Sequence, residues 1–326
     1  MTWAGVNLSE DQRAVSDMVL EWREPLAPLD TDDDAAAETA RAGIVELGVW
    51  SMGMPETVGG DDAAIDLRVA ALAALGGRFA ALAWACAQAH AAAEVLAGAR
   101  VRGELLPHIV AGKQAVAVVD LGSVGVQLTI DGGRASGTIA RIDAGGAEPA
   151  LVILDGDDTA WLLEPSAIRA REAHRRTGFA GARTSSAVID GTVTRISDVA
   201  VSGVRARLRL AGAAIAAGVA LDAAALAADY ASSRVQFGGP LTALPTVRRS
   251  LDQQRRRAVL SLSAAVCDDG ESLDRATGAL AQNLGRAIEV AADALQSHGG
   301  YGYIEEYGVA RLLRDAVSLR AATSMI

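Results

Sequence analysis

Two glycine-rich segments contain the residues best suited to hold a charged ligand. The first is Arg234-Val235-Gln236-Phe237-Gly238-Gly239-Pro240-Leu241, and the second covers residues 296–307. Three glycines fall within four positions of the second segment: Gly299, Gly300 and Gly302. Without Cβ atoms, their backbone N–H groups can come close to a phosphate, and the side-chain amide of Gln296 stands beside them.

Both segments also have a simpler interpretation as turns that end helices. Gly238 and Gly239 would supply left-handed φ angles, and Pro240 would stop the helix from continuing. A single glycine-rich loop is weak evidence for a phosphate site. From these residues alone, both interpretations stay open.

Other groups that could do chemistry are sparse. Glu305 and Glu306 are adjacent carboxylates, but consecutive residues do not share a helix face, so we do not expect either to act as a base. His298 is expected to be structural. The remaining histidines and the two cysteines are scattered, which predicts no metal site and a reducing compartment. They are His90, His108, His174, Cys86 and Cys267.

The composition points to closely packed helices. Of 326 residues, 51% are hydrophobic and only 4% aromatic, so Ala, Leu and Val supply most of the apolar surface. A net charge of −10 without a basic stripe argues against nucleic acid as a partner. Residues 1–6 lack the pattern of a signal peptide, and charges interrupt the alanine-rich runs. We therefore expect a cytoplasmic protein without a membrane span.

The hydrophobic pattern divides the chain into three regions. Helical spacing extends to about residue 112, beginning with a predicted capping box of Ser9 and Gln12. Short β-rich runs follow, and helical runs resume near residue 204. We expect an α+β protein with a helical domain at 1–112, a small β domain at 113–203 and a helical domain at 204–326. The expected helices are 34–47, 63–75, 80–97, 208–232, 243–268, 271–297 and one from 309, and the expected strands are 115–120, 125–131, 134–140, 150–155, 159–164 and 186–193.

The order and separation of the two glycine-rich segments resemble the acyl-CoA dehydrogenase family. The shared motifs are Arg-x-x-Phe-Gly-x-Pro-Leu and Gln-x-x-Gly-Gly-x-Gly-Tyr, with Leu47-Gly48-Val49-Trp50, Pro55-Glu56 and Gly59-Gly60 nearer the N-terminus. The resemblance implies a helical domain, a middle β-barrel or sandwich and a C-terminal four-helix bundle, with FAD as cofactor and acyl-CoA as substrate.

In the family, the flavin lies between two subunits, and one subunit sends these motifs onto the pyrophosphate and adenosine of its neighbour's FAD. The resemblance therefore implies FAD contacts, to a cofactor held mainly by a partner chain, from Arg234, Phe237, Gln296, Gly299, Gly300 and Gly302. A guanidinium and clustered N–H groups suit a pyrophosphate.

The expected catalytic glutamate is absent from both places where the family carries one. Counting onward from Arg314-Asp315-Ala316 leads to Thr323, and counting back from Arg234 leads to Leu208. Neither side chain accepts a proton at neutral pH, so no catalytic residue is assigned. The flavin-ring contacts of the family are not visible either, because 120–125 and 141–146 stand in their place.

Loss of the base with retention of the cofactor motifs resembles the shorter, non-basic subunit of heteromeric acyl-CoA dehydrogenases from actinobacterial steroid and cholesterol catabolism. This resemblance implies an α2β2 heterotetramer with a catalytic acyl-CoA dehydrogenase subunit, and a steroid-derived CoA thioester as substrate class. Two alternatives stay open: a flavin-free scaffold or interaction protein with the same fold, and a homomeric flavin oxidoreductase with a different base.

Overall fold

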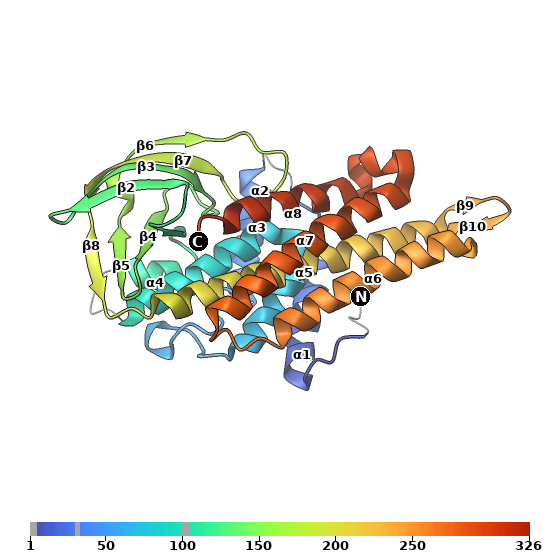
Figure 1. Cartoon of the computed structure of the whole chain (residues 1–326), viewed down its shortest axis with the longest axis horizontal. Helices are drawn as coiled ribbons and strands as arrows, with labels where there is room; N and C mark the ends of the chain where they lie inside the picture. Colours follow the sequence, from blue (N-terminus) through green and yellow to red (C-terminus); the bar gives the residue numbers. More distant parts are fainter. Residues whose placement is uncertain (1–4, 30–32, 99–104) are drawn as a thin grey trace.

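The computed structural model describes residues 5–29, 33–98 and 105–326. Residues 1–4, part of the stretch examined for a signal peptide, lie outside the described residues. Figure 1 shows a β module at one end of the molecule and long helices that extend from it to the other end. The expected α+β fold, with helices before and after a middle β region, is confirmed.

The start of the first helix follows directly from its sequence. The N–H of Gln12 donates to Ser9 Oγ at 3.1 Å, and the N–H of Ser9 donates to Gln12 Oε1 at 2.9 Å. The predicted capping box is therefore confirmed. The helical elements of this region are α1 Glu10–Arg23, α2 Asp34–Glu46, η1 Glu56–Val58, α3 Ile65–Gly98 and α4 Leu105–Val110.

Helix α3 joins two runs that the sequence pattern separates. It bends at Phe79, where φ is −133° and ψ is 49°. Gly76 and Gly77 lie three and two residues before the bend, and glycine weakens a helix because it loses more conformational freedom on folding. The Phe79 ring packs against Trp22 of α1, with ring centroids 5.7 Å apart. The bend thus keeps α3 in contact with α1.

Within 105–326, two four-stranded sheets form the β module. One has the order β1-β4-β5-β8, with β1 and β4 parallel, and the other is antiparallel with the order β2-β3-β7-β6. Apolar side chains such as Ile139, Ile153 and Ile189 fill the space between them. The elements are β1 Val116–Asp120, β2 Val126–Asp131, β3 Arg134–Ile142, β4 Ala150–Asp155, β5 Thr159–Leu163, η2 Pro165–Ala167, β6 Ile168–Ala173, β7 Ser185–Thr192 and β8 Thr194–Ser197.

The C-terminal region consists of four long helices, three 3₁₀ turns and a small hairpin. Figure 1 shows this hairpin projecting from the end of the molecule that is remote from the β module. The elements are α5 Val201–Ser233, β9 Val235–Gln236, β10 Gly239–Pro240, η3 Leu241–Ala243, α6 Pro245–Val266, α7 Leu273–His298, η4 Gly299–Tyr303, η5 Glu305–Tyr307 and α8 Val309–Thr323.

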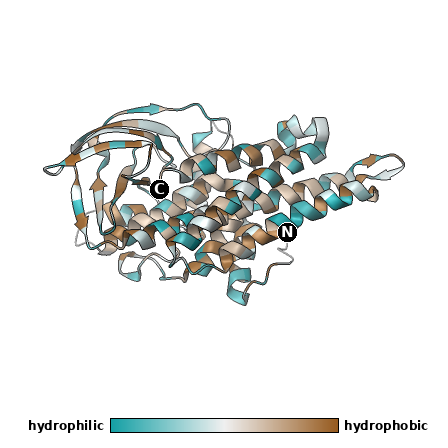
Figure 2. Cartoon of the chain, viewed as in Figure 1, coloured by the Kyte–Doolittle hydropathy of each residue, from teal (hydrophilic) through white to brown (hydrophobic). Residues whose placement is uncertain are grey.

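Helices α3 and α5 pack unusually close together. A Cβ atom on Gly218 would lie 2.0 Å from the carbonyl oxygen of Ala73, and one on Gly76 would lie 2.4 Å from that of Ile215. Both helices are long and apolar enough to cross a membrane by composition, yet 94% and 78% of their most apolar windows are buried in the protein. That burial is typical of core helices, and Figure 2 shows hydrophilic residues gathered on outer helices such as α6.

Candidate functional site

The structure brings the two glycine-rich segments together at the far end of the bundle. Arg234 is the C-cap of α5, and its guanidinium carbon lies 5.2 Å from the ring centroid of Tyr301 in η4. A guanidinium at this distance from an aromatic face is held by a cation–π interaction. Arg234 and the segment Gln296–Tyr307 therefore share one surface, although at least 62 positions separate them in the sequence.

The first segment forms a tight hairpin whose two turn residues are both left-handed. They are Phe237, with φ +55°, and Gly238, with φ +85°. We expected Gly238 and Gly239 to supply the left-handed angles, and that prediction is wrong for Gly239. It pairs with Gln236 as part of β10, so the turn falls one residue earlier. A two-residue hairpin of this type requires positive φ at both central residues.

Phe237 occupies this turn at an energetic cost. A bulky residue at positive φ is uncommon, and the Phe237 side chain is also 86% exposed. Neither burial nor backbone preference therefore explains a phenylalanine here. Strain of this kind clusters at ligand-binding positions.

The second segment ends α7 and places its glycines in different surroundings. Gly299 has φ +58°, and added Cβ atoms on Gly299 and Gly300 would meet nothing within 4 Å. Gly302 is buried, and its added Cβ would lie 2.7 Å from the carbonyl oxygen of Leu295. Gly302 is thus required by packing, whereas Gly299 and Gly300 leave an open surface beside the exposed Gln296.

A cluster of aromatic rings supports this surface, and the sequence analysis did not find it. Tyr230 stacks on His298 with centroids 4.4 Å apart, and Tyr307 packs edge-on against Tyr230 at 5.8 Å. His298 is buried, and its Nδ1 lies 2.8 Å from the carbonyl oxygen of Ala294. Tyr230 lies four residues before Arg234, the spacing of one helix face, which was the available signal.

Both positions examined for a catalytic base lie in the packed interior. Leu208 is 1% exposed and Thr323 is 4% exposed. The Thr323 hydroxyl donates to the carbonyl oxygen of Leu319 at 3.0 Å. On α5, one turn after Leu208, an added Cβ at Gly212 would lie 3.0 Å from Thr323 Cγ2. Thr323 therefore packs tightly against α5, one helical turn after Leu208.

The cavity that Leu208 lines holds only about 20 Å³, enough for one water molecule and too small for an acyl chain. Arg207 and Glu94 form an ion pair in its wall, with Arg207 Nε 2.8 Å from Glu94 Oε2. His90 also lines the cavity, and burial, followed by the charge of Arg68, lowers the pKa of its imidazole to about 4. Burial raises the pKa of the neighbouring Cys86 thiol. His90 and Cys86 are therefore both neutral near pH 7.

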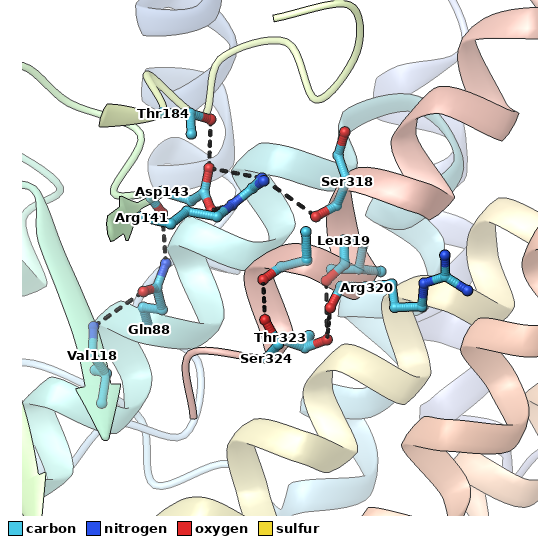
Figure 3. Close-up of polar contacts among 11 residues, drawn as sticks. Gln88, Val118, Arg141, Asp143, Thr184, Ser318, Leu319, Arg320, Thr323 and Ser324 are labelled. Atoms are coloured by element: carbon cyan, nitrogen blue, oxygen red, sulfur yellow. Dashed lines mark hydrogen bonds and ion pairs between the residues drawn. The ribbon is translucent and has the colours of Figure 1, made fainter. Parts of the chain in front are cut away.

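A polar network occupies residues 141–146, one of the two stretches that stand where the family has its flavin-ring contacts. In Figure 3, Arg141 and Asp143 lie between the β module and α8. Arg141 donates to Asp143 at 2.5 Å and to the carbonyl oxygen of Ser318 at 3.3 Å. Thr184 donates to Asp143 at 2.5 Å, and Gln88 of α3 donates to the Asp143 carbonyl oxygen at 2.7 Å. These groups are engaged with one another.

The C-terminal residues cover the second of these stretches, residues 120–125. The N–H of Asp120 donates to the carbonyl oxygen of Met325 at 2.8 Å, and Ser123 Oγ donates to that of Ser324 at 3.2 Å. Asp120 itself pairs with Arg205 of α5 at 2.5 Å. The Met325 side chain lies in the core between the sheets. Here too the surface is occupied by the chain itself.

These observations test the fit of FAD at two places. Around Arg141, Asp143 and Met325, the residues are bonded or packed against one another, and they do not fit a flavin ring. At the far end, the half-buried guanidinium of Arg234, the exposed amide of Gln296 and an open glycine surface fit a pyrophosphate. The N–H of Gly299 already donates to the carbonyl oxygen of Gln296, so Gly299 would contribute space rather than a donor.

Metal ions have no evident site, because the described residues contain no group of three His, Cys, Asp or Glu side chains placed to hold one.

Known proteins resemble this chain in two respects: the sequence of its C-terminal region and its overall fold. The family model described as "Acyl-CoA dehydrogenase, C-terminal domain" matches residues 199–323. An acyl-CoA dehydrogenase of Bacillus subtilis (strain 168) is 37% identical over 114 residues, which are 33% of this chain and 30% of that protein. The match thus spans less than a third of the length of that relative.

Two solved structures match almost the whole chain. Butyryl-CoA dehydrogenase from Megasphaera elsdenii has a TM-score of 0.79 at 21% identity and covers 96% of this chain and 94% of its own. A glutaryl-CoA dehydrogenase from Mycobacterium smegmatis in complex with FADH2 has a TM-score of 0.78 at 18% identity and covers 96% and 90%. The chain therefore has the acyl-CoA dehydrogenase fold, and its residues 199–323 match the acyl-CoA dehydrogenase family.

Proposed function

We propose that this chain is the non-basic subunit of a heteromeric, FAD-dependent acyl-CoA dehydrogenase. In an α2β2 assembly it contributes contacts to the pyrophosphate and adenosine of FAD held mainly by a catalytic partner subunit. When bound, FAD would supply the acceptor for the hydride that leaves the acyl-CoA. The contacts come from one end of the bundle: Arg234, Phe237, Gln296 and the open surface of Gly299 and Gly300, with Gly302 packed beneath it. A steroid-derived CoA thioester is the proposed substrate class.

One contrast within the chain supports this proposal most strongly. The far end keeps a half-buried arginine oriented by the ring of Tyr301, and a strained, exposed phenylalanine that neither burial nor backbone preference explains. The interior positions of the expected bases, by contrast, carry Leu208 and Thr323 in tight packing. A subunit that completes its partner's cofactor site needs the exposed contact surface but does not need a catalytic base of its own.

Arg234 provides the direct test of this proposal. The chain is co-expressed with a full-length acyl-CoA dehydrogenase of its own organism as the candidate catalytic subunit, and FAD is measured by absorbance after release. Arg234→Ala should lower FAD occupancy, since a charged hydrogen bond contributes about 1.5–3 kcal/mol. Arg169→Ala is the matched control, because Arg169 is an exposed arginine on β6, in the remote β module.

Each other outcome contradicts the proposal in a recognisable way. Equal FAD content in Arg234→Ala and Arg169→Ala would remove Arg234 from the cofactor site. A chain that purifies yellow without a partner would support a homomeric flavoprotein. A chain that stays colourless with and without the candidate partner would support a scaffold that keeps only the fold.

A further inference from the structure

A cavity of about 770 Å³ lies between α1, the bend of α3, the C-terminal part of α5 and the start of α8. Its volume is within the range of about 300–1,000 Å³ found for small-molecule sites. None of the six residues assigned to the flavin belongs to its described lining. We call it the arginine pocket, after three lining residues: Arg23, Arg78 and Arg311.

The buried side of the arginine pocket contains hydrogen-bond donors without acceptors. Arg23 is 5% exposed, and its Nη2 donates to Asp222 Oδ1 at 2.7 Å. Its buried Nη1 has no partner in the described part of the chain. Arg311 donates to Asp315 at 2.8 Å and to the carbonyl oxygen of Gly77 at 3.1 Å, while its buried Nε is likewise unpaired there. Buried unpaired donors cost free energy, and they leave these two guanidinium groups with fewer compensating partners than fully paired ones would have.

The guanidinium of Arg78 adds a third positive charge to this wall of the pocket. Nη1 of Arg78 donates to the carbonyl oxygen of Leu26 at 2.6 Å. Burial, followed by the charges of Arg23 and Arg311, lowers the pKa of Arg78. Asp222 and Asp315 compensate only part of this positive charge. A carboxylate or phosphate among the three groups would relieve their mutual repulsion.

The exposed side of the same pocket has the opposite charge. Five carboxylates line it, and all five residues are exposed: Asp17, Glu21, Glu24, Asp229 and Glu306. These carboxylates repel a simple anion at the entrance and attract a cation. The pocket therefore presents a positive inner wall and a negative rim to one and the same occupant.

From this juxtaposition we infer that the arginine pocket binds a small zwitterion, with its anionic group against Arg23, Arg78 and Arg311 and its cationic group at the carboxylate rim. The inference is independent of the proposed function, because no flavin or acyl-CoA group takes part in it.

Isothermal titration calorimetry of the full chain tests the inference with defined probes. The zwitterions are 4-aminobutyrate, lysine and lysyl-alanine, which increase in length, and the control ligands are succinate and cadaverine. We expect saturable binding of at least one zwitterion and weaker binding of both control ligands. The inference is overturned if no zwitterion binds saturably, which would leave the pocket to a basic segment of a partner protein, or if succinate binds equally well.

Three variants separate this pocket from other sites. Arg78→Gln removes a half-buried donor and should weaken zwitterion binding about tenfold or more. The double variant Asp229→Asn, Glu306→Gln removes exposed rim charges and should weaken it about two- to fivefold per charge while strengthening succinate binding. Glu305→Gln, next to the rim but outside the pocket lining, should change nothing. Equal affinities in all three variants would overturn the inference.

Discussion

Asp143→Asn should destabilise the protein by breaking the polar network that joins the β module to the helices. The aspartate is 5% exposed and accepts from Arg141 at 2.5 Å and from Thr184 at 2.5 Å. Asparagine preserves the shape, and its backbone carbonyl still accepts from Gln88. The substitution therefore removes the negative charge with little change in volume.

The magnitude follows from the charged hydrogen bonds to the Asp143 carboxylate, two from Arg141 and one from Thr184. Each contributes about 1.5–3 kcal/mol when buried, but the Arg141 side chain is 24% exposed, so its share is reduced by solvent. We expect a loss of about 2–4 kcal/mol in the free energy of unfolding.

Urea unfolding followed by circular dichroism at pH 7 measures this loss. The matched control is Asp190→Asn, which breaks the ion pair with Arg134 whose side chains are 61% and 44% exposed. Exposed pairs contribute less than about 1 kcal/mol, so the control should lose little. If both variants lost the same free energy, the network around Asp143 would not hold the two parts together as argued.

Three further predictions concern stability and cofactor retention. Burial lowers the pKa of His90 to about 4, whereas an unfolded histidine titrates near 6.5, so the unfolded state binds more protons between these two pH values. The free energy of unfolding should therefore fall by up to about 3 kcal/mol as the pH drops from 6.5 to 4. Unfolding titrations should show a smaller fall for His90→Gln, and an equal fall would contradict a buried, neutral His90. Gly218→Ala should lower the midpoint temperature of thermal unfolding, because its added Cβ would clash with the Ala73 carbonyl oxygen. The control Gly278→Ala has open space around its added Cβ and should leave the midpoint unchanged or raise it. Similar midpoints for the two variants would rule out the tight α3–α5 contact. Phe237→Asn should raise stability by up to about 1 kcal/mol by relieving the left-handed turn and should lower FAD retention in the complex, and unchanged retention would remove Phe237 from the site.

Local patterns in the sequence predicted most of the secondary structure. The capping box at Ser9 depends only on residues three apart, and six strands fall within two residues of the expected runs. The sequence pattern missed β6 and β8, which lie at the edges of their sheets. In β6, Arg169, Arg171 and Glu172 obscure the alternation of apolar residues, since an edge strand buries little of its surface.

Features that depend on tertiary contact could not be predicted. Arg234 and the glycine-rich segment were both identified from their residue types, but the ring of Tyr301 that orients the arginine became visible only in the fold. The arginine pocket combines residues from α1, α3, α5 and α8, and no single segment carries its pattern. The position of the hairpin turn at Phe237 likewise follows from strand pairing rather than from glycine content.

The FAD content of the purified complex tests the central claim most directly. The chain is co-expressed with the candidate catalytic acyl-CoA dehydrogenase, the particle mass is determined in solution, and released FAD is counted against both chains. The account predicts a four-chain particle with one FAD for each pair of unlike chains. One FAD per chain would contradict it, because this chain would then hold a flavin of its own.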